Sequence, residues 1–190
     1  DIVMAMEDAY SNEYITSAAA QALHARVALY MQDWDTAIEY ASILIDDKKN
    51  TFKLADAKTK YNADYTFFDY MWAYDLSYEI IWRIGFTETS YGSPLGTVFL
   101  NFTKDLTYYY PDYVPATAAL NLYDAADLRY SGYFAGKEQG LTIGYTNGLD
   151  WPMLVKYYGN RNFTSKLIFH VSMPKPFRLA EQYLIRAEAY

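Results

Sequence analysis

The 190-residue sequence contains no cysteine, and this absence excludes three kinds of chemistry within the chain. Without thiols there is no disulfide, no thiolate nucleophile and no zinc site built on cysteine. Histidine is also scarce, because only His24 and His170 are present. We expect His24 to be an ordinary helix residue and His170 to lie in a short extended segment. Neither indicates a metal site, and we expect no cofactor.

Long apolar runs and clustered basic residues are missing as well. No run approaches the length of about 18 apolar residues that a transmembrane helix needs. Lysine and arginine number 16 against 23 aspartates and glutamates, and the net charge of −7 argues against a nucleic-acid-binding face. The sequence also lacks a glycine-rich phosphate loop and a nucleophile elbow.

The stretch from 22 to 46, ALHARVALYMQDWDTAIEYASILID, has the spacing of two packed helices. Asp33 is expected to cap the second helix, and Tyr30 and Trp34 to fill the space at the turn. The first helix is expected to present a stripe made of Ala19, Leu23, Val27 and Tyr30, extended by Ala22, Ala25 and Leu29. The second helix is expected to bury Trp34, Ala37, Ile38, Ala41, Leu44 and Ile45. This is the pattern of a tetratricopeptide-type repeat, which needs stacked partners.

The last stretch, FRLAEQYLIRAEAY, predicts the first helix of a further repeat. Pro174 and Pro176 precede it, where the chain can enter a helix. Its stripe is expected to consist of Ala180, Tyr183, Leu184, Ala187 and Tyr190. The pattern stops without a glycine or polar cap, so we expect the chain to be part of something longer.

The region between these ends has a different texture. Residues 77–86, SYEIIWRIGF, predict a short strand, and ATAALNLYDAADLRY predicts short helical turns. The rest is rich in glycine, proline and aromatic residues, and should be irregular. We therefore divide one partial domain into a helical hairpin (1–47), a loop-rich aromatic insertion (48–175) and the start of a further repeat helix (176–190). The predicted fold class is mainly α, with tetratricopeptide-like hairpins separated by this insertion and a few short strands.

Tyrosine is unusually frequent, with 22 residues beside 10 phenylalanines and 4 tryptophans. An aromatic face can carry the C–H face of a sugar ring, while polar side chains hydrogen-bond the sugar hydroxyls. In the irregular part no helical period requires the aromatic residues for packing. The predicted ligand-binding residues are Tyr108, Tyr109, Tyr110 and Tyr113, with a second group of Tyr91, Phe99, Asn101 and Phe102. The alternative role for each is packing on the helical scaffold.

Several segments, in one order, resemble the SusD/RagB family of bacterial outer-membrane nutrient-binding lipoproteins. They are the hairpin ALHARVALYMQDWDTAIEYA, the segment YEIIWRI, the stretch YYPDYVPATAALNLYDAADLRYSGYF with its Asp127 and Arg129, the VKYYG motif and the final FRLAEQYLIRAEAY. The resemblance implies a SusD-like α-α superhelix, in which repeat-like helix pairs are separated in sequence and stack in space.

The resemblance also implies a cell-surface protein of the Bacteroidetes type that binds oligosaccharides or polysaccharides without catalysis. Its partners would be the glycan and a SusC-like TonB-dependent transporter, with no nucleic acid. It would sit at the outer membrane through a lipid anchor upstream of this chain. Some relatives are associated with peptides, and much of the family's binding surface lies in an N-terminal part that this chain lacks. The net negative charge favours neutral over polyanionic glycans.

Two other function classes stay open. A tetratricopeptide-type scaffold binds a peptide or protein in its concave groove. A glycoside hydrolase needs a pair of carboxylates, for which the candidates are Asp124, Asp127 and Glu7, or Asp46 with Asp47. The expected role of these carboxylates is a helix-surface or a capping position. Asp127 and Arg129 face different directions if helical, and each is expected to fix the insertion to the scaffold.

Overall fold

The computed structural model describes residues 12–47, 49, 51–92, 94–102, 108–124, 126–145 and 150–190. The described part is mainly helical with a few short strands, as the sequence predicts. Its α-helices are α2 (Ser17–Tyr30), α3 (Trp34–Ile45), α4 (Phe67–Tyr74), α5 (Thr117–Leu120), α6 (Leu128–Tyr133), α7 (Arg161–Thr164) and α8 (Leu179–Ala189). Its strands are β1 (Ile80–Trp82), β2 (Phe134–Ala135), β3 (Met153–Leu154) and β4 (Phe177–Arg178), and single 3-10 turns are η2 (Leu95–Val98) and η3 (Lys137–Gln139).

The chain divides into two compact units, each described by itself. The first contains the described residues of 1–56, 76–85 and 173–190, and the second those of 57–75 and 86–172. Segment 76–85 lies within the region that the sequence suggests as an insertion, but it belongs to the first unit. It contributes β1, which pairs antiparallel with β4 directly before α8.

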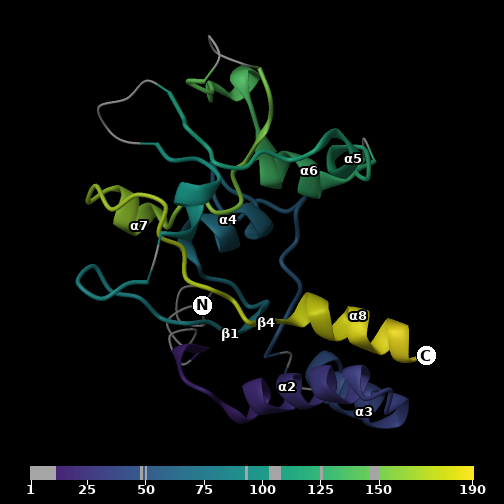
Figure 1. Ribbon diagram of the computed structural model, residues 1–190. Helices are drawn as coiled ribbons and strands as arrows, with labels where there is room; N and C mark the ends of the chain where they lie inside the picture. The colour runs from purple at the N-terminus through teal and green to yellow at the C-terminus, as the bar shows by residue number, and fades with distance from the viewer. Residues whose placement is uncertain are drawn as a thin grey trace. The chain divides into compact units, whose positions relative to one another are not determined.

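The first unit is built on the helical hairpin. Helices α2 and α3 lie side by side, and α8 packs against both (Figure 1). The Thr16 hydroxyl accepts a hydrogen bond from the Ala19 N–H at 3.3 Å, and this bond caps α2. Asp33 Oδ1 accepts from the Thr36 N–H at 3.3 Å and caps α3, as the sequence predicts. Gln32 takes a positive φ of 59°, and this left-handed residue separates α2 from α3 at the expected position.

The buried face of α2 agrees with the predicted one at Ala19, Ala22 and Ala25 and differs from it at the larger side chains. Its fully buried residues are Ala19, Ala22, Ala25 and Ala28, whereas Leu23, Val27 and Tyr30 of the predicted stripe are exposed, Tyr30 by 82%. Trp34 is also exposed at the turn. Alanine side chains let neighbouring helix backbones approach closely, and larger side chains on that face would hold them apart. In α3, Ala37, Ala41 and Leu44 are buried as predicted.

Helix α8 also buries a face other than its predicted stripe. The buried residues are Leu179, Gln182, Ile185 and Ala189, whereas Leu184 is 70% exposed. Ile185 and Ala189 pack on the alanines of α2 and α3, because that side of α8 faces the hairpin. Polar contacts fix the helix on α2. Arg26 donates to Glu181 Oε1 and Oε2 at 2.5 and 2.7 Å and lies 4.3 Å from the centroid of the Phe177 ring.

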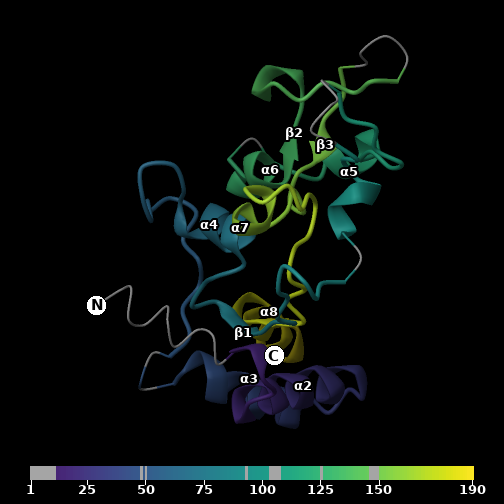
Figure 2. The same ribbon diagram turned by 90° about the vertical axis from the view of Figure 1, so that its left-hand side faces the viewer.

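Helix α4 in the second unit was not predicted from the sequence, although a local signal marks its start. Thr66 and Asp69 form a capping box, in which the Asp69 N–H donates to the Thr66 hydroxyl at 3.1 Å. In return, Asp69 Oδ2 accepts from the Thr66 N–H at 3.4 Å. The helix ends at Asp75, which takes the left-handed conformation with φ 58° and is fully buried. Helix α4 lies beside α7 (Figure 2).

The core of the second unit forms where distant irregular segments meet. Leu100, Tyr109, Ile143 and Met153 make one buried cluster. Tyr109 pairs with Ile143 in a parallel bridge, and β2 pairs antiparallel with β3 (Figure 2). Val155 and Tyr158, which follow β3, pack against this cluster. The insertion therefore has its own hydrophobic core, although it contains little regular structure.

His170 is a buried residue of the second unit with a left-handed backbone conformation, and it does not lie in an extended segment. It has a positive φ of 63° and is 3% exposed. Its Nε2 accepts a hydrogen bond from the Phe102 N–H at 2.8 Å, and its Nδ1 lies 3.2 Å from the Tyr158 carbonyl oxygen. Nε2 also lies 3.0 Å from the Phe102 carbonyl oxygen, so backbone groups of Phe102 and Tyr158 surround both ring nitrogens. Burial lowers the pKa of His170.

We expect the free energy of unfolding to fall as the pH drops below about 6.5, the usual pKa of an unfolded histidine. The folded pKa is lower, so below this pH the unfolded chain binds the extra proton first and folding loses stability until the folded pKa is passed. Urea titrations between pH 7.5 and 5 would measure this slope. His170→Gln should remove the corresponding part of the slope. An unchanged slope in that variant would contradict the assignment to His170.

Candidate functional site

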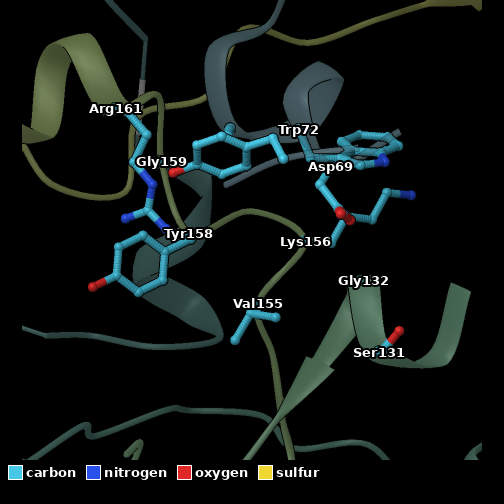
Figure 3. Close-up of a pocket in the computed structure, with 11 residues that line it drawn as sticks. Asp69, Trp72, Ser131, Gly132, Val155, Lys156, Tyr158, Gly159 and Arg161 are labelled. Atoms are coloured by element: carbon cyan, nitrogen blue, oxygen red, sulfur yellow. The ribbon is translucent and has the colours of Figure 1, made fainter. Parts of the chain in front are cut away.

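A cavity of about 160 Å³ opens in the second unit (Figure 3). Three separate segments line it. Helix α4 contributes Asp69 and Trp72, and helix α6 contributes Ser131 and Gly132. The segment after β3 contributes Val155, Lys156, Tyr158, Gly159 and Arg161. Gly132 permits close packing there, because a Cβ at this position would lie 3.0 Å from the Phe68 ring.

Trp72 and Lys156 form one wall of this cavity, and the rings of Tyr133 and Tyr157 lie next to the lysine. Trp72 and Tyr133 meet edge to face, with their ring centroids 6.0 Å apart. The Lys156 ammonium nitrogen lies 4.4 Å from the Trp72 centroid, 4.8 Å from the Tyr133 centroid and 5.3 Å from the Tyr157 centroid. The quadrupoles of the three rings attract this ammonium and fix its position. In Figure 3 Lys156 lies beneath the indole of Trp72.

A second cation lies on the opposite wall. The Arg161 guanidinium carbon is 4.3 Å from the Tyr158 ring centroid, and Figure 3 shows both side chains across the cavity from Trp72. Arg161 begins α7, whose N-cap is Asn160. The Asn160 amide donates to Asp75 Oδ2 at 2.8 Å and to the Tyr74 carbonyl at 2.9 Å, and so ties α7 to the end of α4. These bonds position Arg161 relative to Trp72.

A second, wider cavity of about 330 Å³ shares Ser131 with the first. Tyr123, Asp124, Asp127, Leu128 and Tyr130 form the rest of its lining. Two of these lining residues are aromatic and contact each other, because the ring centroids of Tyr123 and Tyr130 lie 5.9 Å apart. The Tyr130 ring also meets Phe134, with centroids 5.4 Å apart. Ligand pockets usually measure about 300–1,000 Å³, so the two neighbouring cavities together offer more suitable room than the first alone.

Asp127 and Arg129 contact each other, contrary to the expectation that they point in different directions. Asp127 is the N-cap of α6 and so lies outside the helix proper. Its Oδ1 accepts from the Arg129 N–H at 3.0 Å, and its Oδ2 pairs with Arg129 Nη2 at 2.5 Å. These hydrogen bonds lower the pKa of the Asp127 carboxyl to about 2. Asp127 therefore stays ionised and is engaged in capping, which does not suit a general acid.

Four of the residues predicted to bind ligand are packed inside the second unit or partly covered there. Tyr109 is 7% exposed, and its hydroxyl lies 3.2 Å from that of Tyr158. Burial raises the pKa of Tyr109, and the hydrogen bond to Tyr158 adds to the shift. Phe102 stacks on Tyr109 with centroids 4.7 Å apart, and Phe99 stacks on Tyr157 at 6.1 Å. Asn101 takes a positive φ of 44° in the turn between them.

The other predicted residues reach the surface to different extents. Tyr91, Tyr108 and Tyr113 are exposed, Tyr113 by 67%. Tyr110 is half-buried and meets Tyr145 edge to face at 5.2 Å. None of these residues lines either cavity described above. They remain predictions of a surface platform, separate from the cavity between α4 and α6.

The residues that line the first cavity were not among the predicted site residues, although some of them, Lys156 included, belong to the VKYYG motif singled out from the sequence. The pattern Thr66-x-x-Asp69 before an apolar run was the available signal for α4. No signal links Trp72 to Arg161, because they lie far apart in sequence. Within the described ranges, no group of three or more histidines and carboxylates could hold a metal ion. No described helix is long and apolar enough to cross a membrane.

Comparison with known proteins identifies the fold. No protein-family model matches the sequence, and no curated protein matches it. Among solved structures, surface glycan-binding protein A from Bacteroides uniformis matches with a TM-score of 0.67 and 18% identity, over 96% of this chain and 39% of that one. A SusD superfamily protein from Bacteroides thetaiotaomicron VPI-5482 matches with a TM-score of 0.63 and 20% identity, over 99% of this chain and 41% of that one. The chain has a SusD-like fold.

The SusD-like chain therefore spans about two fifths of the length of these solved neighbours. The similarity extends over nearly all of the chain, so it covers the helical hairpin, the aromatic region and the final helix together. The ordered segments that suggested the fold from sequence thus predicted it correctly. A shared fold does not establish a shared ligand, so we infer the ligand from the cavity, where aromatic faces lie beside hydrogen-bonding and charged groups.

Proposed function

We propose that the SusD-like chain belongs to a non-catalytic cell-surface protein, which binds glycans for import through a SusC-like TonB-dependent transporter. The observation that carries the proposal is the cavity between α4 and α6, where aromatic rings stand beside Asp69, Ser131 and Arg161. In this proposal the protein is held at the outer membrane by a lipid anchor. The printed name of the neighbour from Bacteroides uniformis, a surface glycan-binding protein, agrees with this function.

The chemistry of the cavity suits a saccharide better than a purely apolar ligand. A sugar ring has C–H faces that pack on aromatic rings, and hydroxyls that need donors and acceptors around the edge. Trp72 and Tyr158 supply ring surface, and the Ser131 hydroxyl and Asp69 carboxylate supply polar atoms at the same cavity. The adjoining cavity at Tyr123 and Tyr130 continues the same chemistry. Packing and hydrogen bonding of this kind bind a sugar without any reacting group. Asp127, a carboxylate that lines the adjoining cavity, forms an ion pair with Arg129.

Trp72→Ala should weaken binding of the recognised polysaccharide by about tenfold or more, because tryptophans in buried binding pockets often carry over 1.4 kcal/mol. The measurement is affinity electrophoresis of the whole, non-lipidated protein through gels that contain plant, fungal or host polysaccharides. Trp34→Ala is the matched control, since Trp34 lies exposed on α3 in the first unit. That variant should migrate like the parent protein.

The same gels separate this cavity from the surface tyrosines. A double variant, Tyr108→Ala with Tyr113→Ala, removes two exposed rings outside the cavity. Loss of retardation only in the tyrosine variant would transfer the site to the platform predicted from sequence. Unretarded migration of the parent protein through every gel would contradict glycan binding and favour a peptide ligand. Release of reducing ends from a bound polymer would contradict the non-catalytic role.

A further inference from the structure

The charge around the first cavity is opposite in sign to the charge of the whole chain. The chain carries a net charge of −7. The cavity, however, is lined by two cations, Lys156 and Arg161, and by one carboxylate, Asp69. This local excess of positive charge lies in a hollow, where the surrounding protein screens charges less than open solvent does.

Aromatic rings hold both cations in place. The Lys156 ammonium lies 4.4 Å from the Trp72 ring centroid and 4.8 Å from that of Tyr133, so these rings hold the positive charge at the cavity. An ammonium carries three N–H donors, and cation–π attraction acts through its charge. Arg161 lies over Tyr158 at 4.3 Å in the same way, and a guanidinium offers donors in a planar fork that matches a carboxylate or a sulfate.

The one carboxylate of the cavity has a structural role. Asp69 Oδ2 accepts hydrogen bonds from the Thr66 hydroxyl at 2.7 Å and from the Thr66 N–H at 3.4 Å, and these bonds form the capping box of α4. Asp69 is therefore held at the N-terminus of its own helix. The positive groups stand on both walls of the cavity, as Figure 3 shows.

We propose that the cavity between α4 and α6 binds a sugar residue that carries an anionic group, either the carboxylate of a uronic acid or a sulfate ester. The inference rests on the proposed glycan-binding function and narrows its ligand class. It reverses the preference for neutral glycans that the net charge suggests, because local charges at the contact decide recognition and the distant carboxylates are screened by salt.

The test compares polymers that differ only in charge. The whole protein is titrated by calorimetry with polygalacturonate, with the same polymer after full methyl esterification, and with dextran sulfate against dextran. We expect at least one anionic polymer to bind at least tenfold more tightly than its neutral counterpart at low salt, with the difference shrinking as salt is raised. The carboxylate and sulfate arms identify which anion is recognised.

Two variants assign the charge effect to the cavity. Lys156→Gln and Arg161→Gln should each lower affinity for the anionic polymer by about tenfold, since hydrogen bonds between charged groups are stronger than neutral ones. Their effect on the neutral polymer should be small. Lys137→Gln is the matched control, because it removes one exposed charge from the same unit outside the cavity.

Equal binding of charged and neutral polymers would overturn this inference and leave glycan binding intact. Equal losses with both polymers in the two variants would also overturn it, because they would show that Lys156 and Arg161 only support the fold of the pocket. Absence of binding to every polymer would instead contradict the proposed function itself.

Discussion

Leu100→Ala is expected to lower the free energy of unfolding by about 2–5 kcal/mol, the usual cost of removing a buried leucine side chain. Leu100 is 0% exposed and lies at the centre of the cluster with Tyr109, Ile143 and Met153. Interiors of proteins are close-packed, so neighbouring rings cannot fully refill the space that the mutation leaves. Urea unfolding followed by near-ultraviolet circular dichroism measures the change.

Leu122→Ala provides the matched control, since Leu122 is 86% exposed in the same unit. This variant should change stability by less than about 0.5 kcal/mol, as surface substitutions usually do. Similar losses in the two variants would contradict the assignment of Leu100 to a packed core. The result also bears on the site, because Val155 and Tyr158 pack on the same cluster and line the cavity.

The helical part of the fold could be predicted because its signals are local. Asp33 caps α3, and the break at Gln32 lies between two stretches with a period of 3.6 residues. The buried faces were harder to predict. The sequence pattern predicts that Leu23 and Val27 are buried together with the alanines of α2. In the structure only the alanines form the interface, and Leu23 and Val27 are exposed. Which face is buried depends on the neighbours of a helix, and a short amphipathic pattern does not specify them.

The binding region was predicted only in part, for a related reason. Tyrosine-rich irregular chain indicates an adaptable surface, yet sequence does not tell which rings pack inward. Tyr109 turned inward because it pairs with Ile143, a contact between segments far apart along the chain. The cavity likewise combines Trp72, Ser131 and Arg161 from three distant segments. Such sites follow from tertiary packing, and only the capping box at Thr66 gave a local signal.

Asp75→Ala is expected to destabilise the second unit by about 2–4 kcal/mol and to weaken glycan binding as a consequence. Asp75 is fully buried and accepts a hydrogen bond from the Asn160 amide at 2.8 Å. Removing a partner from a buried polar group costs about 1–3 kcal/mol, and alanine is also less favourable than aspartate at the positive φ of 58°. The lost bond joins the end of α4 to the start of α7, and therefore Trp72 to Arg161.

Asp75→Asn separates the two contributions. Asparagine tolerates the left-handed conformation, and its amide oxygen can still accept the hydrogen bond from Asn160. It should therefore retain most of the stability that Asp75→Ala loses, in the same urea titrations. If both variants lose stability equally, the bond to Asn160 is not what stabilises this junction. If Asp75→Ala unfolds like the parent protein yet still binds glycan less tightly, the junction acts on the geometry of the cavity rather than on folding. The structure supports the expected result, in which Asp75→Ala loses both stability and binding and Asp75→Asn retains most of both, because the same two helices carry the buried bond and the cavity walls.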